Sequence, residues 1–319
     1  MNIKVLEKSE VNLERLAALT YVARKRNNLL AEGTTEEAIL RNISEGIAEY
    51  CHDLVFVAEH NGEIVGWLAF YDMSDSGIAS IWDWHPVVFP GEHEDEIASA
   101  LIQEAFSHLR EIDLHKVAID FQVNERTHSC FTRYLKWYAR AGITEIIEEK
   151  YYKRDLTEAD VEGVIPDAYS LGYISETDLD DLFECWVGVF SSCDDRFLLN
   201  LDAEGRKALF FDSWSRAKPL IHEASLTLSH QGHLIGFVRF LPLYGPTDAY
   251  LAPIGILSEY RRKGLAQELL KMGMTKLKAS KYQTMSCYVS TSNSAAISFY
   301  EKMGFVSRHK ITSLFGEMI

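Results

Sequence analysis

The chain has 319 residues, of which 47% are hydrophobic, and its formal net charge at pH 7 is −15. This length exceeds the roughly 100 to 200 residues of a typical single domain, so we expect two domains. The acidic balance argues against nucleic acid and anionic membranes as partners, because both require a surplus of Lys and Arg. No apolar run approaches the roughly 18 residues of a membrane span, and the charged first residues are not typical of a signal peptide. We therefore expect a cytoplasmic protein.

The five cysteines lie far apart and form no Cys-x-x-Cys pair. Their number is odd, so the spacing favours neither a disulfide framework nor a metal site. We expect buried thiols and no metal. Nothing in the sequence indicates the oligomeric state.

An internal repeat organises the chain, because residues 57–70 align without gaps on residues 227–240. The first copy predicts a hairpin turning at Asn61-Gly62, a strand at residues 79–88, an amphipathic helix over residues 97–109 and a strand at residues 115–123. A further helix and a final strand pair follow it.

The second copy predicts the same order of elements. Its hairpin turns at Gln231-Gly232, and a strand at residues 249–257, a helix over residues 265–277 and a strand at residues 284–290 follow. A further helix and closing strands follow here too, so each copy is expected to complete its own sheet. The result is an α/β fold of two similar domains, residues 1–158 and 159–319, each a mostly antiparallel mixed sheet flanked by helices.

Three cations and a glycine precede the second copy's first helix, at Arg261, Arg262, Lys263 and Gly264. Cations are unfavourable at a helix N-terminus, whose aligned peptide dipoles already carry positive charge. Gly264 lacks a side chain and Ala266 has a small one, so an anion can approach the free N–H groups there. The pattern indicates a phosphate site, with a solvated basic cap as the alternative.

Two motifs in this copy resemble the GNAT superfamily of acetyl-CoA-dependent N-acetyltransferases. Arg261-x-x-Gly264-x-Ala266, between a strand and an amphipathic helix, is similar to the family's pyrophosphate loop. The stretch at residues 293–305, which reads Asn-Ser-Ala-Ala-Ile-Ser-Phe-Tyr-Glu-Lys-Met-Gly-Phe, is similar to its second signature. The resemblance covers roughly residues 220–315 closely.

This resemblance implies a set of roles for residues of the second copy. The strand ending at Ile254, Ile256 and Leu257 would pair with the pantetheine amides of acetyl-CoA. The loop would hold the pyrophosphate, and Tyr300 would be the general acid that protonates the leaving thiolate. The resemblance implies the following cofactor-binding residues: Ile254, Ile256, Leu257, Arg261, Arg262, Lys263, Gly264, Leu265, Ala266 and Asn293.

The attacking amine also needs a base, and the sequence leaves several candidates. Asp248 and Tyr250 share a strand face by alternation, and Asp248 is the better base by its ordinary pKa. His222 and Glu223, before the hairpin, are further candidates. An ordinary exposed polar residue is the alternative for each of them.

The first copy departs from the motif where the cofactor would bind. Its aligned loop has His93 at the cation position and Glu96 at the glycine position, and its carboxylates would repel a pyrophosphate. Tyr138 aligns with Tyr300. We expect a degenerate GNAT domain that keeps the fold, an arrangement that resembles the tandem GNAT proteins known as mycothiol synthases.

The predicted function is acetyl transfer from acetyl-CoA to the primary amine of a small molecule. An excess of carboxylates draws cations, so a cationic amine is the expected acceptor. The alternative is a non-catalytic acyl-CoA-binding or interaction scaffold. Aromatic residues of the helices before the second hairpin are expected to form core rather than a pocket: Phe183, Trp186, Phe190, Phe197, Phe210, Phe211 and Trp214.

Overall fold

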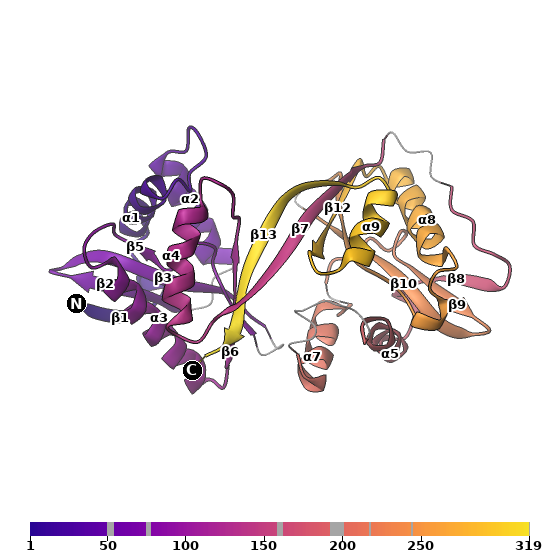
Figure 1. Ribbon diagram of the computed structural model, residues 1–319, viewed down its shortest axis with the longest axis horizontal. Helices are drawn as coiled ribbons and strands as arrows, with labels where there is room; N and C mark the ends of the chain where they lie inside the picture. Colours follow the sequence, from indigo (N-terminus) through magenta and orange to yellow (C-terminus); the bar gives the residue numbers. More distant parts are fainter. Residues whose placement is uncertain are drawn as a thin grey trace. The chain divides into compact units, whose positions relative to one another are not determined.

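The computed structural model describes residues 1–49, 54–74, 78–157, 162–191, 201–216, 218–243 and 245–318. The chain forms two compact units, one made of Met1–Ile147 with Lys310–Ile319 and the other of Glu148–His309. Figure 1 labels their helices and strands. The expected domain boundary, between residues 158 and 159, lies outside the described residues.

The first unit is a mixed sheet in the order β1, β2, β3, β4, β6 and the C-terminal part of β13, with β5 paired to β3. Helices α3 and α4 contribute to the core on one face, and α1 and α2 to a second core on the other. Its elements are β1 (Asn2–Glu7), η1 (Lys8–Glu10), α1 (Leu13–Arg26), α2 (Glu36–Glu49), β2 (Leu54–His60), β3 (Glu63–Ser74), β4 (Ile78–Ile81), β5 (Val87–Val88), α3 (Glu94–Glu111), β6 (Lys116–Phe121) and α4 (His128–Ala139).

The second unit repeats this plan in the order β7, β12, β11, β10, β9 and β8. Helices α8 and α9 cover one face of its sheet, and α5 and α7 cover the other (Figure 1). Its elements are β7 (Glu145–Asp155), β8 (Tyr169–Tyr173), η2 (Ile174–Glu176), α5 (Leu179–Phe190), α7 (Ala203–Ser213), β9 (Leu226–His230), β10 (His233–Pro242), β11 (Asp248–Ile256), η3 (Ser258–Tyr260), α8 (Leu265–Ala279), β12 (Thr284–Ser290), α9 (Ser294–Lys302) and β13 (Val306–Glu317).

Both predicted hairpins are confirmed, and their turns have the same backbone conformation. The φ angles are 51° and 81° at Asn61 and Gly62, and 52° and 81° at Gln231 and Gly232. Two successive positive φ angles define the turn that matches the right-handed twist of a hairpin, and the second position suits glycine. The repeated turn therefore fixes the same strand register in both units.

The predicted strand at residues 79–88 is wrong in its second half. Strand β4 ends at Ile81, and the chain then leaves the sheet through Trp84, whose φ is 58°. It returns to the sheet as the short strand β5. The corresponding strand of the second unit, β11, runs unbroken to Ile256. The two copies thus differ at the strand that precedes the expected cofactor loop.

The prediction that each copy closes its own sheet is also wrong. Strand β7, from the first copy, pairs with β12 of the second unit over seven positions. Strand β13, from the second copy, pairs with β6 of the first unit from Thr312 opposite Phe121 to Glu317 opposite Lys116. Each closing strand begins in one compact unit and ends in the other, which its length allows, since a strand of average length has only five or six residues.

The exchange of the closing strands β7 and β13 predicts where the second unit can be separated from the rest of the chain. A fragment starting at residue 160 lacks β7, and with it Tyr152 and Leu156, which are 0% and 1% exposed. A fragment starting at residue 145 keeps them. Because losing one large buried side chain costs about 2 to 5 kcal/mol, we expect the longer fragment to unfold at a clearly higher temperature in calorimetry. Equal unfolding temperatures for the two fragments would show that β7 does not support the second unit.

Candidate active site

The parallel strands β11 and β12 separate within the sheet of the second unit. They pair at three positions, from Asp248 opposite Thr284 to Tyr250 opposite Ser286. Beyond this point β11 continues along β10, and β12 continues along β7. Main-chain groups of residues 251–256 that point toward β12 therefore have no β12 partner, and an extended ligand can pair with them as an added strand does.

Strand β11 also bulges in its separated part. Val238 of β10 is opposite Ile254, whereas Phe240 is opposite Leu251, so Arg239 faces two residues of β11. Bulges redirect side chains and main-chain groups, and they are frequent beside active sites. Of the residues predicted to contact the cofactor here, Ile254 and Leu257 are half-buried and Ile256 is buried.

The loop after β11 ends at an open helix N-terminus. Gly264 precedes α8 with a φ of 79°, a conformation that suits glycine. A Cβ atom added at Gly264 would have no other heavy atom within 4 Å. Among the described residues, no main-chain carbonyl accepts from the N–H groups of Leu265, Ala266 and Gln267. These donors and the helix dipole are therefore available to an anion.

The three cations of this loop have different surroundings. Arg261 donates from Nε to the Ile256 carbonyl at 2.9 Å and from Nη2 to the Val189 carbonyl at 2.6 Å. Its guanidinium thus fastens the loop to the end of β11 and to α5. Arg262 and Lys263 are exposed and form no ion pair with any described residue. Lys263 Nζ lies 4.9 Å from the centre of the Tyr260 ring. Both charges are accessible to an anion in solvent.

Tyr300 lies in α9, where its side chain is 8% exposed. Its ring contacts the rings of Phe299 and Phe305, with centroids 5.3 and 5.2 Å away. Burial raises the pKa of Tyr300 well above the usual 10, and the neighbouring Cys287 and Tyr250 raise it further. Its hydroxyl makes no hydrogen bond with a described residue. Tyr300 therefore keeps its proton at neutral pH and can donate it.

Two other predicted residues are engaged by protein groups. Asp248 accepts a hydrogen bond from the Thr284 hydroxyl, and its Oδ1 lies 3.6 Å from Lys153 Nζ. It lies at the closed end of the separation, where β11 and β12 are still paired. Asn293 caps α9, because its side chain accepts from the Ala296 N–H at 3.0 Å. Neither group is as free as the Tyr300 hydroxyl.

A pocket of about 140 Å³ lies on the face of the second unit's sheet that α5 and α7 cover. Four basic side chains line it, from Arg216, Lys218, His222 and Arg239. Of these, only His222 is a candidate that the sequence itself predicts. Arg239 stands alone as a cation in the apolar run of residues 234–241, and this was the available signal. Trp214, expected in the core, is buried and also lines the pocket, while Phe197 lies outside the described residues.

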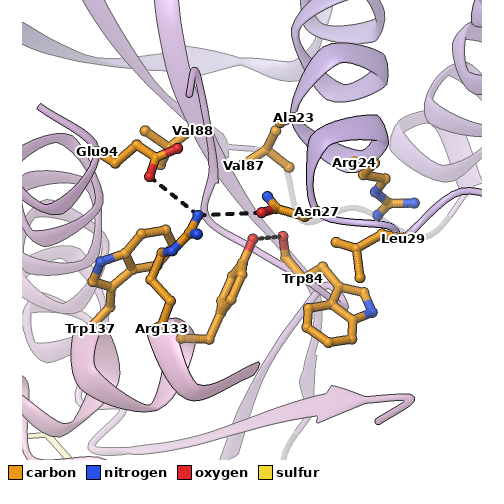
Figure 2. A pocket seen from close by; sticks show the side chains of 11 residues that line it. Ala23, Arg24, Asn27, Leu29, Trp84, Val87, Val88, Glu94, Arg133 and Trp137 are labelled. Carbon is orange, nitrogen blue, oxygen red and sulfur yellow. Dashed lines mark hydrogen bonds and ion pairs between the residues drawn. The ribbon is translucent and has the colours of Figure 1, made fainter. Parts of the chain in front are cut away.

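The first unit has carboxylates of its own in the first turn of the equivalent helix, α3. Glu94, in the first turn of α3, lies 3.0 Å from Arg26 and 3.2 Å from Arg133. Asp95 accepts from the Trp137 indole N–H at 2.7 Å, a bond that lowers the pKa of this carboxyl. Figure 2 shows Arg133 hydrogen-bonded to both Glu94 and Asn27, beside a pocket of about 10 Å³. A pyrophosphate would have to displace these contacts.

The rest of the first unit's equivalent site is also occupied. Tyr138, which aligns with Tyr300, is fully buried, and its hydroxyl donates to the His85 carbonyl at 2.7 Å. Trp84 packs against the rings of Phe121 and Tyr134, with centroids 5.0 and 5.6 Å away. The Tyr138 hydroxyl is therefore engaged by the protein, and the chain after β4 is packed into the core.

In the part of the chain that the structure describes, no helix is both long and apolar enough to cross a membrane. No three His, Cys, Asp or Glu side chains of the described residues gather as they would around a metal ion. Cys130, Cys185 and Cys287 are buried free thiols, and Cys51 and Cys193 lie outside the described residues.

The sequence matches the model of the Acetyltransferase (GNAT) family twice, over residues 23–137 and 183–305. Because these matches cover more than half of the chain, the protein belongs to the GNAT acetyltransferase family. The predicted tandem of two GNAT domains is confirmed, and with it the predicted α/β fold class. A search of curated proteins found no match.

Three solved structures are similar over 99% of this chain. A GCN5-related N-acetyltransferase from Sphaerobacter thermophilus has a TM-score of 0.62 and 14% identity, with 95% of that chain covered. A tandem GNAT protein from the clavulanic acid biosynthesis pathway has a TM-score of 0.56 and 14% identity, with 98% of that chain covered. A glucosamine N-acetyltransferase region of a fungal multi-domain GH3 β-N-acetylglucosaminidase has a TM-score of 0.62 and 12% identity, with 38% of that chain covered. Such identities show a shared fold alone, and the resemblance to mycothiol synthases stays a prediction.

The open terminus of α8 predicts the effect of one substitution. Gly264→Glu places a carboxylate where the anion would bind, so we expect calorimetry to detect no acetyl-CoA binding. Gly232→Glu is the matched control, because Gly232 has nearly the same φ, 81°, in an exposed turn. It should retain the affinity, as should Glu96→Gly in the first unit. Unchanged affinity in Gly264→Glu would remove this loop from the cofactor site.

Proposed function

We propose that the second unit transfers an acetyl group from acetyl-CoA to the primary amine of a small molecule. Membership of the GNAT family supports acyl transfer. The observation that carries the proposal is the separation of β11 from β12 beside an uncapped helix N-terminus. The first supplies unpaired main-chain groups for an amide-containing arm, and the second supplies donors for a pyrophosphate.

The proposed cofactor contacts follow the order of the chain. Residues 251–256 pair with the pantetheine arm, and the N–H groups of Leu265 and Ala266 bind the pyrophosphate. Arg262 and Lys263 supply countercharge. We assign Arg261 a positioning role, because its guanidinium is bound to two main-chain carbonyls.

The proposed reaction is direct transfer. The amine nitrogen attacks the acetyl carbonyl carbon, the carbon–sulfur bond breaks, and the thiolate takes the proton of the Tyr300 hydroxyl. The raised pKa of Tyr300 suits this role, since the phenol is protonated over the whole neutral range. The free hydroxyl distinguishes Tyr300 from Tyr138, whose proton is already donated to a carbonyl.

The contacts of the predicted candidates indicate which of them is the base that receives the amine proton. Asp248 is engaged by Thr284 and Lys153. The pKa of Glu223 is lowered by hydrogen bonds with its own main chain and with Ser280, which makes it a weaker base. His222 alone of the three lines the pocket on the α5 and α7 face. We therefore favour His222 over Asp248 for this step.

The charge of the acceptor depends on the pocket rather than on the whole chain. A net charge of −15 favours a cationic amine at long range. Salt screens that attraction over about 8 to 10 Å, whereas groups lining a pocket act at contact. Because the lining includes Arg216, Lys218 and Arg239, the proposal does not require a cationic acceptor.

The role of Tyr300 predicts a separation of binding from turnover. Tyr300→Phe removes the hydroxyl and keeps the ring, so acetyl-CoA affinity should hold while kcat falls about 10²- to 10⁴-fold. Thiol release over an amine library measures kcat, and calorimetry measures affinity. Tyr138→Phe, the matched control in the first unit, should leave kcat within about twofold.

Two outcomes would contradict this assignment. Full turnover in Tyr300→Phe would exclude Tyr300 as the acid while leaving the transfer reaction intact. Tight acetyl-CoA binding without thiol release on any amine, in the wild-type chain, would instead favour a non-catalytic acyl-CoA-binding scaffold.

A further inference from the structure

Arg239 links the pocket on the α5 and α7 face to the strand proposed to hold the cofactor. Its Nη1 donates to the Ala252 carbonyl, in the bulge of β11, at 3.4 Å. Its Nη2 donates to the Ser213 carbonyl at the end of α7. The guanidinium also lies 4.8 Å from the centre of the Trp214 ring. Arg239 therefore connects the pocket to the part of β11 that separates from β12.

This buried cation has no anionic partner among the described residues. Arg239 is 6% exposed, and an arginine has five N–H donors, of which the two contacts above use two. Burial lowers the pKa of Arg239 to about 10, which reflects the cost of holding its charge away from water. Buried charges in proteins are normally paired, so a bound anion would complete this site.

The other basic groups of the pocket are held in place. Arg216 donates to the carbonyls of Ser175 and Thr177, which fixes its guanidinium against η2. Lys218 Nζ lies 3.4 Å from Asp212 Oδ1. No Asp or Glu is among the described residues that line the pocket. The local charge is thus positive, in contrast to that of the chain.

We propose that this pocket binds the carboxylate of the acceptor, so that the enzyme acetylates a small amino carboxylate such as an amino acid. This inference rests on the proposed acetyl transfer. Planar guanidinium groups match the two oxygens of a carboxylate, and desolvation strengthens such bonds. At about 140 Å³, the pocket is similar in size to a cavity that holds one benzene, so a small carboxylate group fits it.

The arrangement also orients the acceptor. In this proposal the carboxylate binds Arg216 or Arg239, and the amine lies toward the bulge of β11, to which Arg239 is hydrogen-bonded. His222 lines the same pocket and is placed to take the amine proton. A diamine would instead bring a second cation among three basic side chains, a like-charge contact that disfavours binding.

The test compares acceptors that differ only in this group. The full chain is assayed by thiol release with the common L-amino acids, β-alanine and 4-aminobutyrate, with their amides, and with the amines that lack the carboxylate. Amino phosphonates of matched length test a phosphate-like group. We expect kcat/KM for the best carboxylate to exceed that for its amide by about 10- to 100-fold, the range of a charge-assisted hydrogen bond.

Arg216→Gln supplies the specific variant, since Arg216 is exposed and its loss should not unfold the protein. It should raise KM for the carboxylate at least tenfold, leave KM for the amide unchanged and leave acetyl-CoA affinity unchanged. Lys207→Gln, an exposed cation on α7 outside the pocket, is the matched control and should change none of these. Diamines, neutral amines or phosphonates as the best acceptors would overturn the proposal, as would an unchanged carboxylate preference in Arg216→Gln.

A binding measurement separates this inference from the proposed function. Calorimetry with the same carboxylates and amides, at saturating CoA, requires no turnover. If no acceptor is acetylated but carboxylates bind to wild type and tenfold more weakly to Arg216→Gln, the pocket assignment stands and the transfer reaction fails. If amines are acetylated but neither rates nor binding favour carboxylates, the transfer reaction stands and the pocket assignment fails.

Discussion

An α-helix N-terminus leaves main-chain N–H groups without partners, and each unit of this chain places such a terminus after the corresponding strand of its sheet. In the first unit the carboxylates of Glu94 and Asp95 lie in the first turn of this helix, where Arg26, Arg133 and the Trp137 indole bind them, and no described side chain caps the helix. In the second unit Gly264 leaves the terminus open. The same terminus thus carries negative side chains in one unit and is accessible to an anion in the other.

The strand that precedes each of these helices also differs between the two units. In the first unit β4 ends after four residues, and Trp84 is buried in the core. In the second unit β11 continues past the point where it leaves β12, so its main chain stays available. The loop, the strand and the surroundings of the tyrosine thus all differ between the two units, and all three differences disfavour a bound cofactor in the first unit.

Because the closing strands are exchanged, the second unit depends on a strand of the first copy. Strand β7 contributes Tyr152, fully buried, to the core of the second unit, and its hydroxyl donates to Glu301 in α9 at 3.0 Å. Tyr300 lies in the same helix one position earlier. The first copy therefore supports the helix that carries the proposed acid, even though its own site is filled.

Local patterns in the sequence predicted much of this structure. The paired turns at Asn61-Gly62 and Gln231-Gly232, the amphipathic periodicity of α3 and α8, and the loop before Leu265 depend on neighbouring residues, so they can be read from a single sequence. The strand exchange could not be predicted in this way, because the side chains of β7 and β13 alternate between the two faces of a sheet whichever sheet these strands join.

The basic pocket was missed for a different reason. Arg216, Lys218 and Arg239 come from a connecting segment and a strand, and only the fold brings them together. A net charge summed over the chain conceals such a local reversal. The partners of Asp248 were equally hidden, since Thr284 and Lys153 lie on β12 and β7.

In the proposed function, only one of the two similar units has an open cofactor site. The number of acetyl-CoA molecules that the full chain binds tests this, measured by titration calorimetry with an independently determined protein concentration. We expect one molecule per chain, with a single affinity. Two molecules per chain would contradict it, because the first unit would then accept the ligand that its own side chains are argued to replace.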